Sequence, residues 1–324
     1  MNILITGGTG SFGKSFLDKI LSKKNNFRKI IIFSRDEYKQ HILKKKFSNN
    51  KNFNKLRFFL GDVRDKDRLN MALRNVDIII HAAALKQVDS AEYNPTEYIK
   101  TNVIGAQNII DCSIQNNIKK VIALSTDKAS SPINLYGATK LCSDKLFVSA
   151  NYYSGKNIFS VVRYGNVFGS RGSVVEVFKN RKNKKFLSVT HKSMTRFNIT
   201  LRESIDMVLW CLKHSHGSEI FVPKIKSYRV IDLAKAFSKD AKIKFIGIRA
   251  GEKINEELIS INESRTTVDL GKYYAILPEF NFFLNSNYKN KKKVPKNFSY
   301  TSDKNQFLSI TELKELIKNE NIEV

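Results

Sequence analysis

Cysteine and proline are scarce in this sequence of 324 residues, which has three cysteines and five prolines. Cys112, Cys142 and Cys211 are odd in number and lack Cys-x-x-Cys spacing, which argues against a disulfide framework and against a zinc site. We therefore expect reduced thiols in a cytoplasmic protein, and no metal. His214 and His216 have no third ligand nearby in the sequence, and we expect them in a solvated loop.

Long hydrophobic runs are also absent. No apolar stretch approaches the ~18 residues that a transmembrane helix needs. Met1 leads directly into the apolar segment 3–5, without the basic and apolar regions of a signal peptide. The sequence therefore predicts a protein with no membrane partner. Hydrophobic residues still make up 42% of the chain, which is enough to bury a large core in one or two domains.

Acidic residues are few relative to basic ones. The chain has 30 Asp and Glu against 56 Lys and Arg, which gives a formal net charge of +26. Such an excess can indicate a nucleic-acid-binding protein, because phosphate contacts dominate that affinity. Here the lysines are spread along the whole chain, and dense clusters such as 44–46 and 291–293 suit solvated loops and helix ends. We therefore expect anionic small substrates, and no nucleic acid, as partners.

A glycine-rich loop near the N-terminus is the first positive signal. Residues 3–5 form a short apolar strand, and a Gly-x-x-Gly-x-x-Gly pattern follows it. Such a loop lets the backbone approach a pyrophosphate, and the helix that we expect from about Lys14 points its N–H groups at that group. The loop thus predicts a dinucleotide cofactor. The residues expected to hold it here are Gly7, Thr9, Gly10, Ser11, Phe12 and Gly13.

The end of the second predicted strand bears on which dinucleotide binds. Residues 30–33 are apolar and lead into Ser34, Arg35, Asp36 and Lys39. A carboxylate at this point selects NAD through the ribose 2′-hydroxyl, whereas Arg with Ser suits the 2′-phosphate of NADP. We expect NADP, bound by Ser34, Arg35 and Lys39. Because Asp36 supplies such a carboxylate, NAD is an alternative cofactor. A helix capped by Asp36, with Arg35 in solvent, is a further alternative.

Two more strands end in residues that suit the same crevice. The third predicted strand ends at Asp62 and Val63, where Asp62 is expected to bond the adenine amino group. The fourth ends in small residues around Ala82, which let a cofactor lie against the backbone, and Lys86 follows them. Open parallel sheets bind ligands at these strand ends. His81, on the fourth strand, is expected to be a core residue.

A catalytic arrangement is predicted where the fifth strand leads into the next helix. The strand delivers Thr126, Asp127 and Lys128 at its carboxyl end, and the helix carries Tyr136 and Lys140 one turn apart. We expect the Lys140 ammonium to lower the pKa of the Tyr136 phenol, so that Tyr136 acts as a base while Thr126 bonds the reacting hydroxyl. This pattern is typical of sugar oxidation by hydride transfer to a nicotinamide. A solvated helix face would show the same Tyr-x-x-x-Lys spacing.

Strands and helices alternate through the first half of the chain. This order predicts an α/β fold, a Rossmann-type doubly wound parallel sheet. We expect an NADP-binding lobe over 1–167, with return elements near 200–222, and a smaller substrate-binding lobe over 168–324. The expected strands are residues 3–5, 30–33, 56–60, 76–84, 121–124 and 158–162.

Five segments form a recognisable set together with the glycine-rich loop: 82–86, 125–129, 132–140, 163–167 and 194–197. The set resembles the extended short-chain dehydrogenase/reductases that act on nucleotide sugars. More narrowly, it is similar to the inverting UDP-N-acetylglucosamine 4,6-dehydratases, which begin pseudaminic acid synthesis. The resemblance implies NADP as cofactor, UDP-N-acetylglucosamine as substrate, and a homo-oligomer.

In this resemblance Asp127 and Lys128 carry out the dehydration. After Tyr136 and NADP⁺ have oxidised the sugar C4 hydroxyl, the C5 proton is acidic and water leaves from C6. By resemblance, Lys128 is the base for C5, which requires burial to lower its pKa, and Asp127 is the acid for C6, which requires a raised pKa. Hydride return to C6 and reprotonation of C5 on the opposite face give the L-arabino 4-keto-6-deoxy sugar. An ordinary surface ion pair is the alternative interpretation of these two residues.

The resemblance also implies where the UDP-sugar binds. Asn166 would touch the substrate, residues 171–175 would close over it, and Arg196 would meet the diphosphate and uridine together with the loop 249–253. The substrate-binding residues implied in this way are Lys86, Asn166, Arg171, Gly172, Ser173, Val174, Val175, Thr195, Arg196, Arg249, Gly251, Glu252 and Lys253.

Other functions stay open beside this one. Ala250 stands where the family usually has Pro, and Gln87 where it usually has His, so the nearby loop and sugar contact depart from the pattern. A nucleotide-sugar 4-epimerase would need Tyr136 and Lys140 but has no use for the acid and base before them. A non-catalytic NADP-binding regulator would predict no turnover at all.

Overall fold

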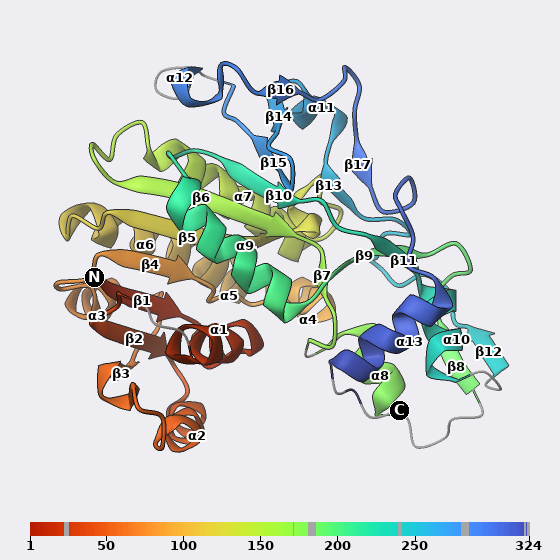
Figure 1. The fold of residues 1–324 in the computed structure, drawn as a ribbon, viewed down its shortest axis with the longest axis horizontal. Coiled ribbons are helices and arrows are strands. Elements are labelled where there is room, and N and C mark those ends of the chain that lie inside the picture. Colours follow the sequence, from red (N-terminus) through yellow and green to blue (C-terminus); the bar gives the residue numbers. More distant parts are fainter. Residues whose placement is uncertain are drawn as a thin grey trace.

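The structure of the protein is a computed structural model, and it describes residues 1–22, 26–170, 172–180, 186–238, 242–279, 285–320 and 322. A ten-stranded sheet forms its centre (Figure 1). From one edge to the other, its strands are β16 (Lys292–Lys293), β14 (Thr267–Asp269), β15 (Tyr273–Ile276), β10 (Ile220–Pro223), β6 (Ile158–Tyr164), β5 (Lys120–Thr126), β4 (Ile78–His81), β1 (Asn2–Thr6), β2 (Lys29–Ser34) and β3 (Leu56–Leu60).

The strands from β10 to β3 run parallel, and β15, β14 and β16 add an antiparallel edge. The order β3-β2-β1-β4-β5-β6 is the order of a doubly wound dinucleotide-binding sheet. The predicted Rossmann-type fold is therefore confirmed. The six predicted strands correspond to β1 through β6, although β4 is shorter than expected because the chain leaves the sheet after His81.

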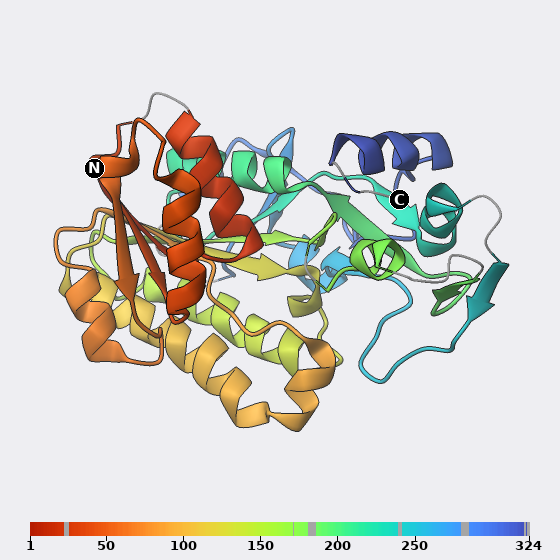
Figure 2. The ribbon, with the colours of Figure 1, turned by 90° about the horizontal axis from the view of Figure 1, so that it is seen from below.

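Helices cover both faces of the sheet (Figure 2). Ile3 and Ile5 of β1 pack in the core of one face and Leu4 in that of the other, as the alternation along a doubly covered strand requires. Helices α1 (Ser11–Ser22), α2 (Glu37–Phe47) and α9 (Leu201–His214) contribute to the first core. Helices α3 (Lys66–Ala72), α6 (Gly105–Gln115) and α7 (Leu135–Ala150) contribute to the second.

Short helical segments connect these elements near the strand ends. The 3-10 turn η1 (Phe53–Lys55) precedes β3, and η3 (Asp127–Ala129) follows β5 directly. The remaining segments lead from β4 into α6, namely α4 (Val88–Tyr93), α5 (Pro95–Tyr98) and the π-helical turn η2 (Ile99–Ile104).

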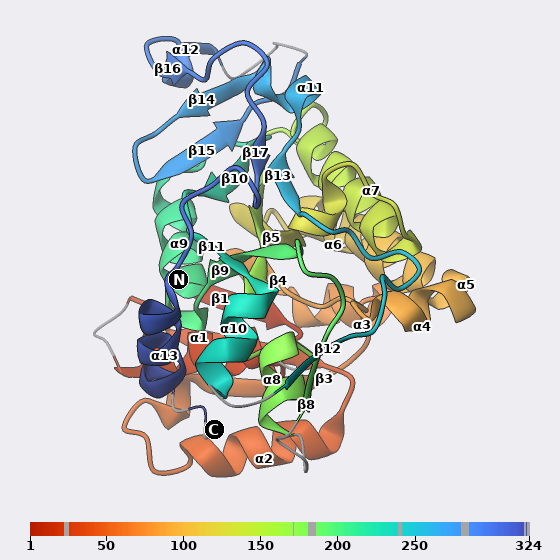
Figure 3. The ribbon, with the colours of Figure 1, turned by 90° about the vertical axis from the view of Figure 1, so that its right-hand side faces the viewer.

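A smaller lobe lies beyond the carboxyl ends of the parallel strands, and Figure 3 shows α8, α10 and α13 together in it. Val175, Phe178, Leu233, Phe237 and Leu313 form part of its apolar core. Its helices are α8 (Val174–Lys179), α10 (Val230–Phe237) and α13 (Ile310–Asn319). Its strands are β7 (Asn166–Val167), β8 (Phe186–Val189), β9 (Thr195–Ile199), β11 (Ser227–Arg229) and β12 (Lys242–Phe245).

The second half of the chain also returns to the main sheet. β10 lies beside β6, close to the return elements expected near 200–222. Residues beyond it add β14, β15 and β16, so the chain after residue 167 builds more than the small lobe, and the division at that residue stays a prediction. The remaining elements are β13 (Glu257–Ile259), β17 (Tyr300–Thr301), α11 (Ile261–Ser264) and α12 (Asn285–Tyr288). Across the described ranges, no helix combines the length and apolar character needed to cross a bilayer.

Candidate active site

A cavity of about 790 Å³ lies at the carboxyl ends of the parallel strands and extends to the small lobe. It brings together most of the residues singled out from the sequence, from the glycine-rich loop to the loop 249–253. The predicted site residues that line it are Gly7, Thr9, Gly10, Ser11, Phe12, Ser34, Arg35, Lys39, Asp62, Val63, Ala82, Lys86, Thr126, Asp127, Lys128, Tyr136, Lys140, Asn166, Val167, Gly172, Ser173, Val174, Arg196, Arg249, Gly251, Glu252 and Lys253.

Three predicted residues do not line this cavity. A Cβ on Gly13 would lie 2.3 Å from the Gly8 carbonyl oxygen, so this glycine lets α1 pack on the loop and does not face a ligand. Val175 is buried in the apolar core of the small lobe. The Thr195 hydroxyl is buried against Ser302, 2.6 Å away, and Asn255. Arg171 lies outside the described residues.

The glycine-rich loop forms a cradle that fits a pyrophosphate. Gly7 has a φ of +65°, and a Cβ on it would lie 2.9 Å from the backbone of Ala82. Its N–H donates to the Phe33 carbonyl at 3.0 Å. Helix α1 begins at Ser11, earlier than the expected Lys14, because the turn from Gly7 to Gly10 leads directly into it. The loop therefore offers backbone at close approach and a helix N-terminus, the two features that a pyrophosphate needs.

Beside the end of β2, Asp36 is engaged in starting a helix. Its carboxylate accepts a hydrogen bond from the Lys39 backbone N–H at 2.9 Å and lies 2.5 Å from the Lys39 ammonium. The Arg35 side chain is 51% exposed, and its guanidinium lies 3.6 Å from Asp62. The alternative of a helix capped by Asp36 is thus realised, and Arg35 lies at the rim of the cavity. Asp62 also accepts hydrogen bonds from Arg64 at 2.7 and 2.9 Å.

The helix that carries Tyr136 and Lys140 is positioned by Asn134. The Asn134 side chain caps α7, since its oxygen accepts from the Gly137 N–H at 2.8 Å. Burial raises the pKa of Tyr136, whereas Lys128 and a hydrogen bond with Thr126 lower it. Burial dominates, and the net pKa is about 12. The Lys140 ammonium instead donates to the Leu124 carbonyl at 2.8 Å. The expectation that Lys140 brings the phenol pKa down to neutral is therefore wrong for this structure.

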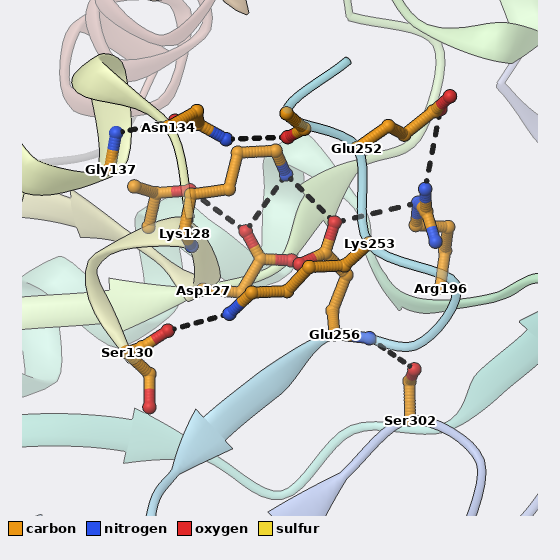
Figure 4. A network of polar contacts seen from close by, with 12 residues as sticks. Asp127, Lys128, Ser130, Asn134, Gly137, Arg196, Glu252, Lys253, Glu256 and Ser302 are labelled. Carbon is orange, nitrogen blue, oxygen red and sulfur yellow. Dashed lines mark hydrogen bonds and ion pairs between the residues drawn. The ribbon is translucent and has the colours of Figure 1, made fainter. Parts of the chain in front are cut away.

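Asp127 and Lys128 form a buried cluster with a third residue, Glu256 (Figure 4). The Lys128 Nζ lies 3.2 Å from Asp127 Oδ1 and 3.3 Å from Glu256 Oε1. The Asp127 and Glu256 side chains are 1% and 2% exposed. This burial rules out an ordinary surface ion pair.

The two predicted pKa shifts of this pair have different outcomes. Burial raises the pKa of Asp127, and the negative charge of Glu256 adds to that rise, which agrees with the predicted direction. Burial lowers the pKa of Lys128, but the two carboxylates beside it outweigh burial and raise that pKa above its ordinary value. The predicted lowering for Lys128 is therefore wrong, because its second carboxylate was not foreseen.

The Arg196 guanidinium already makes hydrogen bonds and ion pairs with other residues of the protein. Its guanidinium donates to the carbonyls of Thr195 and Ile254 at 2.7 and 2.9 Å. It also lies 3.4 Å from Glu252 and 3.6 Å from Glu256. Arg196 thus lines the cavity mainly by holding carboxylates in place, and its expected contact with a diphosphate stays a prediction.

The loop 249–253 is tied to the main lobe at two points (Figure 4). The Gly251 carbonyl accepts from Asn134 Nδ2 at 2.7 Å, and the Lys253 ammonium donates to the Ser130 carbonyl at 2.8 Å. Gly251 has a φ of +72°, and a Cβ there would lie 3.0 Å from the Asn134 side chain. The loop therefore closes directly over the first turn of α7.

Glu256, Tyr228 and Asn134 line the cavity and were not singled out from the sequence. Asn134 carried a detectable signal, because Asn before an apolar helical stretch is a common N-cap. No local sequence pattern identifies Glu256 and Tyr228, since their partners come from distant parts of the chain.

The histidines take structural positions. His81 is buried, and its Nδ1 lies 2.9 Å from the Thr6 hydroxyl, which also accepts from the N–H groups of Ala82 and Ala83. The expected core role of His81 is confirmed. His214 stacks on Trp210 near the end of α9. Among the described residues, no group of three His, Cys, Asp or Glu side chains is arranged to hold a metal ion.

Comparison with known proteins agrees with this geometry. Residues 3–278 match the model of a family described as polysaccharide biosynthesis protein. A UDP-N-acetylglucosamine 4,6-dehydratase (inverting) from Campylobacter jejuni strain 81-176 is 52% identical over 98% of this chain and 97% of that protein. A UDP-glucose 4-epimerase from Rickettsia akari strain Hartford is 43% identical over 97% of this chain and 94% of that protein.

Among solved structures, Pen from Bacillus thuringiensis superposes with a TM-score of 0.90 at 37% identity, covering 99% of this chain and 98% of that one. The matches to these three individual proteins span nearly the whole length of both chains compared. The chain therefore belongs to the polysaccharide biosynthesis protein family, which confirms its predicted place among the extended short-chain dehydrogenase/reductases, beside the inverting UDP-N-acetylglucosamine 4,6-dehydratases.

Proposed function

We propose that this protein oxidises C4 of UDP-N-acetylglucosamine, eliminates water between C5 and C6 and inverts C5, with NADP as its cofactor, as the first step of pseudaminic acid synthesis. The observation that carries the proposal is that Asp127 and Lys128 line the same cavity as Tyr136 and Lys140. The name of the Campylobacter jejuni relative supports the same activity.

With its pyrophosphate in the glycine-rich cradle, the nicotinamide dinucleotide would supply oxidation at C4 and return of hydride to C6. The chain's own residues handle the protons. Tyr136 would take the proton of the C4 hydroxyl as the phenolate, which requires the buried phenol to release its own proton first, since its pKa is about 12. Asp127, whose pKa burial raises, would give a proton to the oxygen leaving C6.

Lys128 would take the C5 proton, and its surroundings add a condition to that role. An ammonium must release a proton before it accepts another. The two carboxylates within 3.3 Å of its Nζ are the acceptors at hand. Transfer to either one leaves a neutral amine beside a neutral carboxylic acid.

The test is proton NMR of the purified protein with UDP-N-acetylglucosamine in D₂O, without added cofactor. We expect a new C6 methyl signal with deuterium at C5. Lys128→Ala should lose both, by the 10²–10⁴-fold that a positioned acid or base contributes. If wild type yields no methyl signal from several UDP-sugars, the proposed dehydration is wrong.

A 4-epimerase is the second candidate, favoured by the name of the Rickettsia akari relative. It predicts a C4 epimer as the product and no C6 methyl signal. It also predicts that Lys128→Ala keeps its activity, because epimerisation moves no proton at C5. The same NMR experiment therefore separates the two activities.

NADP is proposed over NAD because Arg35, Ser34 and Lys39 line the cavity while Asp36 is engaged with Lys39. We expect fluorescence titration to give tighter binding of NADPH than of NADH. Arg35→Ala should remove at least ten-fold of that preference, since a charge-assisted contact contributes about 1.5–3 kcal/mol. Equal binding of the two nucleotides by wild type would refute the assignment.

A cytoplasmic homo-oligomer is also proposed, on the family resemblance and on the unpaired cysteines. Light scattering of the purified protein tests the assembly. A mass of one chain, 37.1 kDa, at micromolar concentration would contradict it.

A further inference from the structure

Glu256 is a buried carboxylate in the wall of the cavity with no role in the reaction described so far. It precedes β13, and its side chain is 2% exposed. Burying a charge is costly unless it is paired. Its Oε1 lies 3.3 Å from Lys128 Nζ and 3.6 Å from Arg196 Nε, so two cations balance it.

The backbone of Glu256 is fixed from the far end of the chain. Its N–H donates to the Ser302 hydroxyl at 2.9 Å, and its carbonyl accepts from the Ser302 N–H at 2.8 Å. The Ser302 hydroxyl lies 2.6 Å from that of Thr195. This clamp holds the carboxylate at a set distance from Lys128 (Figure 4).

The two carboxylates beside Lys128 are not equivalent. Asp127 Oδ1 accepts from Thr126 at 2.8 Å and from Lys128 at 3.2 Å, whereas Glu256 Oε1 has Lys128 and Arg196. Asp127 Oδ2 and Glu256 Oε2 are both buried without a hydrogen-bond partner in the part of the chain that the structure describes. Each carboxylate therefore has one oxygen without a partner among the residues described, but Asp127 has one cation beside it and Glu256 has two.

We propose that Glu256 is a positioning residue that acts through Lys128, serving as its permanent counter-ion so that Asp127 is the carboxyl that carries the transferable proton. This inference rests on the proposed dehydration. It gives the three ionisable side chains separate duties: Glu256 stays charged, Asp127 donates, and Lys128 exchanges the C5 proton.

The pKa shifts of the two carboxylates support this division. Burial raises the pKa of Glu256, but Lys128 and Arg196 outweigh burial and bring it below its ordinary value. Burial and the charge of Glu256 raise the pKa of Asp127. Environments that drive two carboxyl pKa values apart are what an acid and a neighbouring fixed anion require.

Other titratable or charged groups also face this cluster. Tyr136 comes from α7, Tyr228 from β11, and Arg196 from β9. Lys253 comes from the loop 249–253, where Glu252 also pairs with Arg196. Glu256 also pairs with Arg196 and raises the pKa of Tyr228, so a substitution at Glu256 changes the surroundings of these groups as well.

The sign of the expected pH effect follows from charge alone. Removing the negative charge of Glu256 lowers the pKa of both Asp127 and Lys128. Activity falls at high pH when Asp127 loses its proton, and falls at low pH when Lys128 cannot release its own. Both limbs of the kcat profile in Glu256→Gln should therefore move to lower pH, by about one unit or more, as close charges shift a pKa by about 1–3 units.

The experiment measures kcat and KM against pH for wild type, Glu256→Gln and Glu256→Asp with UDP-N-acetylglucosamine. For Glu256→Gln we expect kcat at pH 8 to fall at least ten-fold with KM changed less than three-fold, because Asp127 then becomes the counter-ion of Lys128. Glu256→Asp, which keeps the charge but places it one methylene further away, should shift both limbs in the same direction by less than Glu256→Gln does. Glu257→Gln is the matched control, since its carboxylate bonds Ser130 and Ser131 and does not line the cavity.

Each outcome decides the inference. A Glu256→Gln profile that keeps the wild-type pH limits, or one that Glu257→Gln reproduces, overturns it while wild-type turnover still upholds the dehydration. If Glu256→Gln does not fold, as judged by near-UV circular dichroism, the Glu256→Asp profile decides. There a shift to lower pH supports the counter-ion role, because the charge has moved one methylene away, and an unmoved profile contradicts it.

Discussion

Asn134 joins two functions in one side chain, and substitutions at this position separate them. Its oxygen caps α7 through the Gly137 N–H, and its nitrogen donates to the Gly251 carbonyl at 2.7 Å. Asn134→Ala removes both bonds. Asn134→Asp keeps the cap, because Asp caps as well as Asn, but has no donor for Gly251.

The expected magnitudes follow from the two bonds. Loss of the cap costs about 1 kcal/mol, and loss of the Gly251 hydrogen bond costs about 1 kcal/mol. Asn134→Ala should therefore lower the free energy of unfolding by about 2 kcal/mol, and Asn134→Asp by about 1 kcal/mol. Both variants release the loop 249–253, so KM for the UDP-sugar should rise about five-fold in each. Only Asn134→Ala frays the turn that carries Tyr136, so only it should lower kcat.

Urea denaturation and steady-state kinetics of the two variants test this reasoning. A wild-type KM in Asn134→Asp would refute the claim that this hydrogen bond holds the loop. Equal kcat values in the two variants would refute the claim that the cap positions Tyr136.

Three further predictions concern single residues of the main lobe. Arg163→Met should lower the free energy of unfolding by about 3–5 kcal/mol in urea, because fully buried Arg163 pairs with buried Asp144 at 3.3 Å; a loss below 1 kcal/mol would contradict this. Gly7→Ala should weaken NADPH binding, measured by fluorescence, since its Cβ would meet the Ala82 backbone at 2.9 Å; unchanged affinity would argue against the cradle. Burial lowers the pKa of His81 to about 3, so the unfolded state binds one more proton than the folded state between about pH 6.5 and 3. His81 should thus reduce stability by about 1.4 kcal/mol for each pH unit of acidification in that window, and His81→Asn should show a shallower slope in urea titrations.

The parts of the fold that follow from local pattern were predictable. β1 to β6 are apolar runs bounded by polar residues, and the ligand site of such a sheet lies at its carboxyl ends. The antiparallel edge formed by β14, β15 and β16 was not foreseen. All three strands are short, and β14 and β16 contain polar residues such as Thr267 and Lys292, so only pairing in the folded sheet identifies this edge.

The site residues also divide into those that a local sequence pattern predicts and those that only the folded structure shows. Residues that act at the end of one strand or on one helix face, such as Asp127 and Tyr136, were found because their spacing is local. The protonation of Lys128 was misjudged because its second partner, Glu256, comes from a distant segment. Burial alone would lower that pKa, and only the folded structure shows the carboxylate that reverses the shift.

The clamp between Ser302 and Glu256 has a consequence for the order in which the enzyme is made. The ribosome produces Ser302 about 15–60 s after the glycine-rich loop at typical elongation rates. The sheet that cradles the dinucleotide can therefore begin to form while the anion beside Lys128 still lacks its anchor. A nascent chain in this interval has a place for a nucleotide but not yet a fixed set of proton-transfer groups. The proton-transfer groups are therefore fixed in place only after Ser302 has been made.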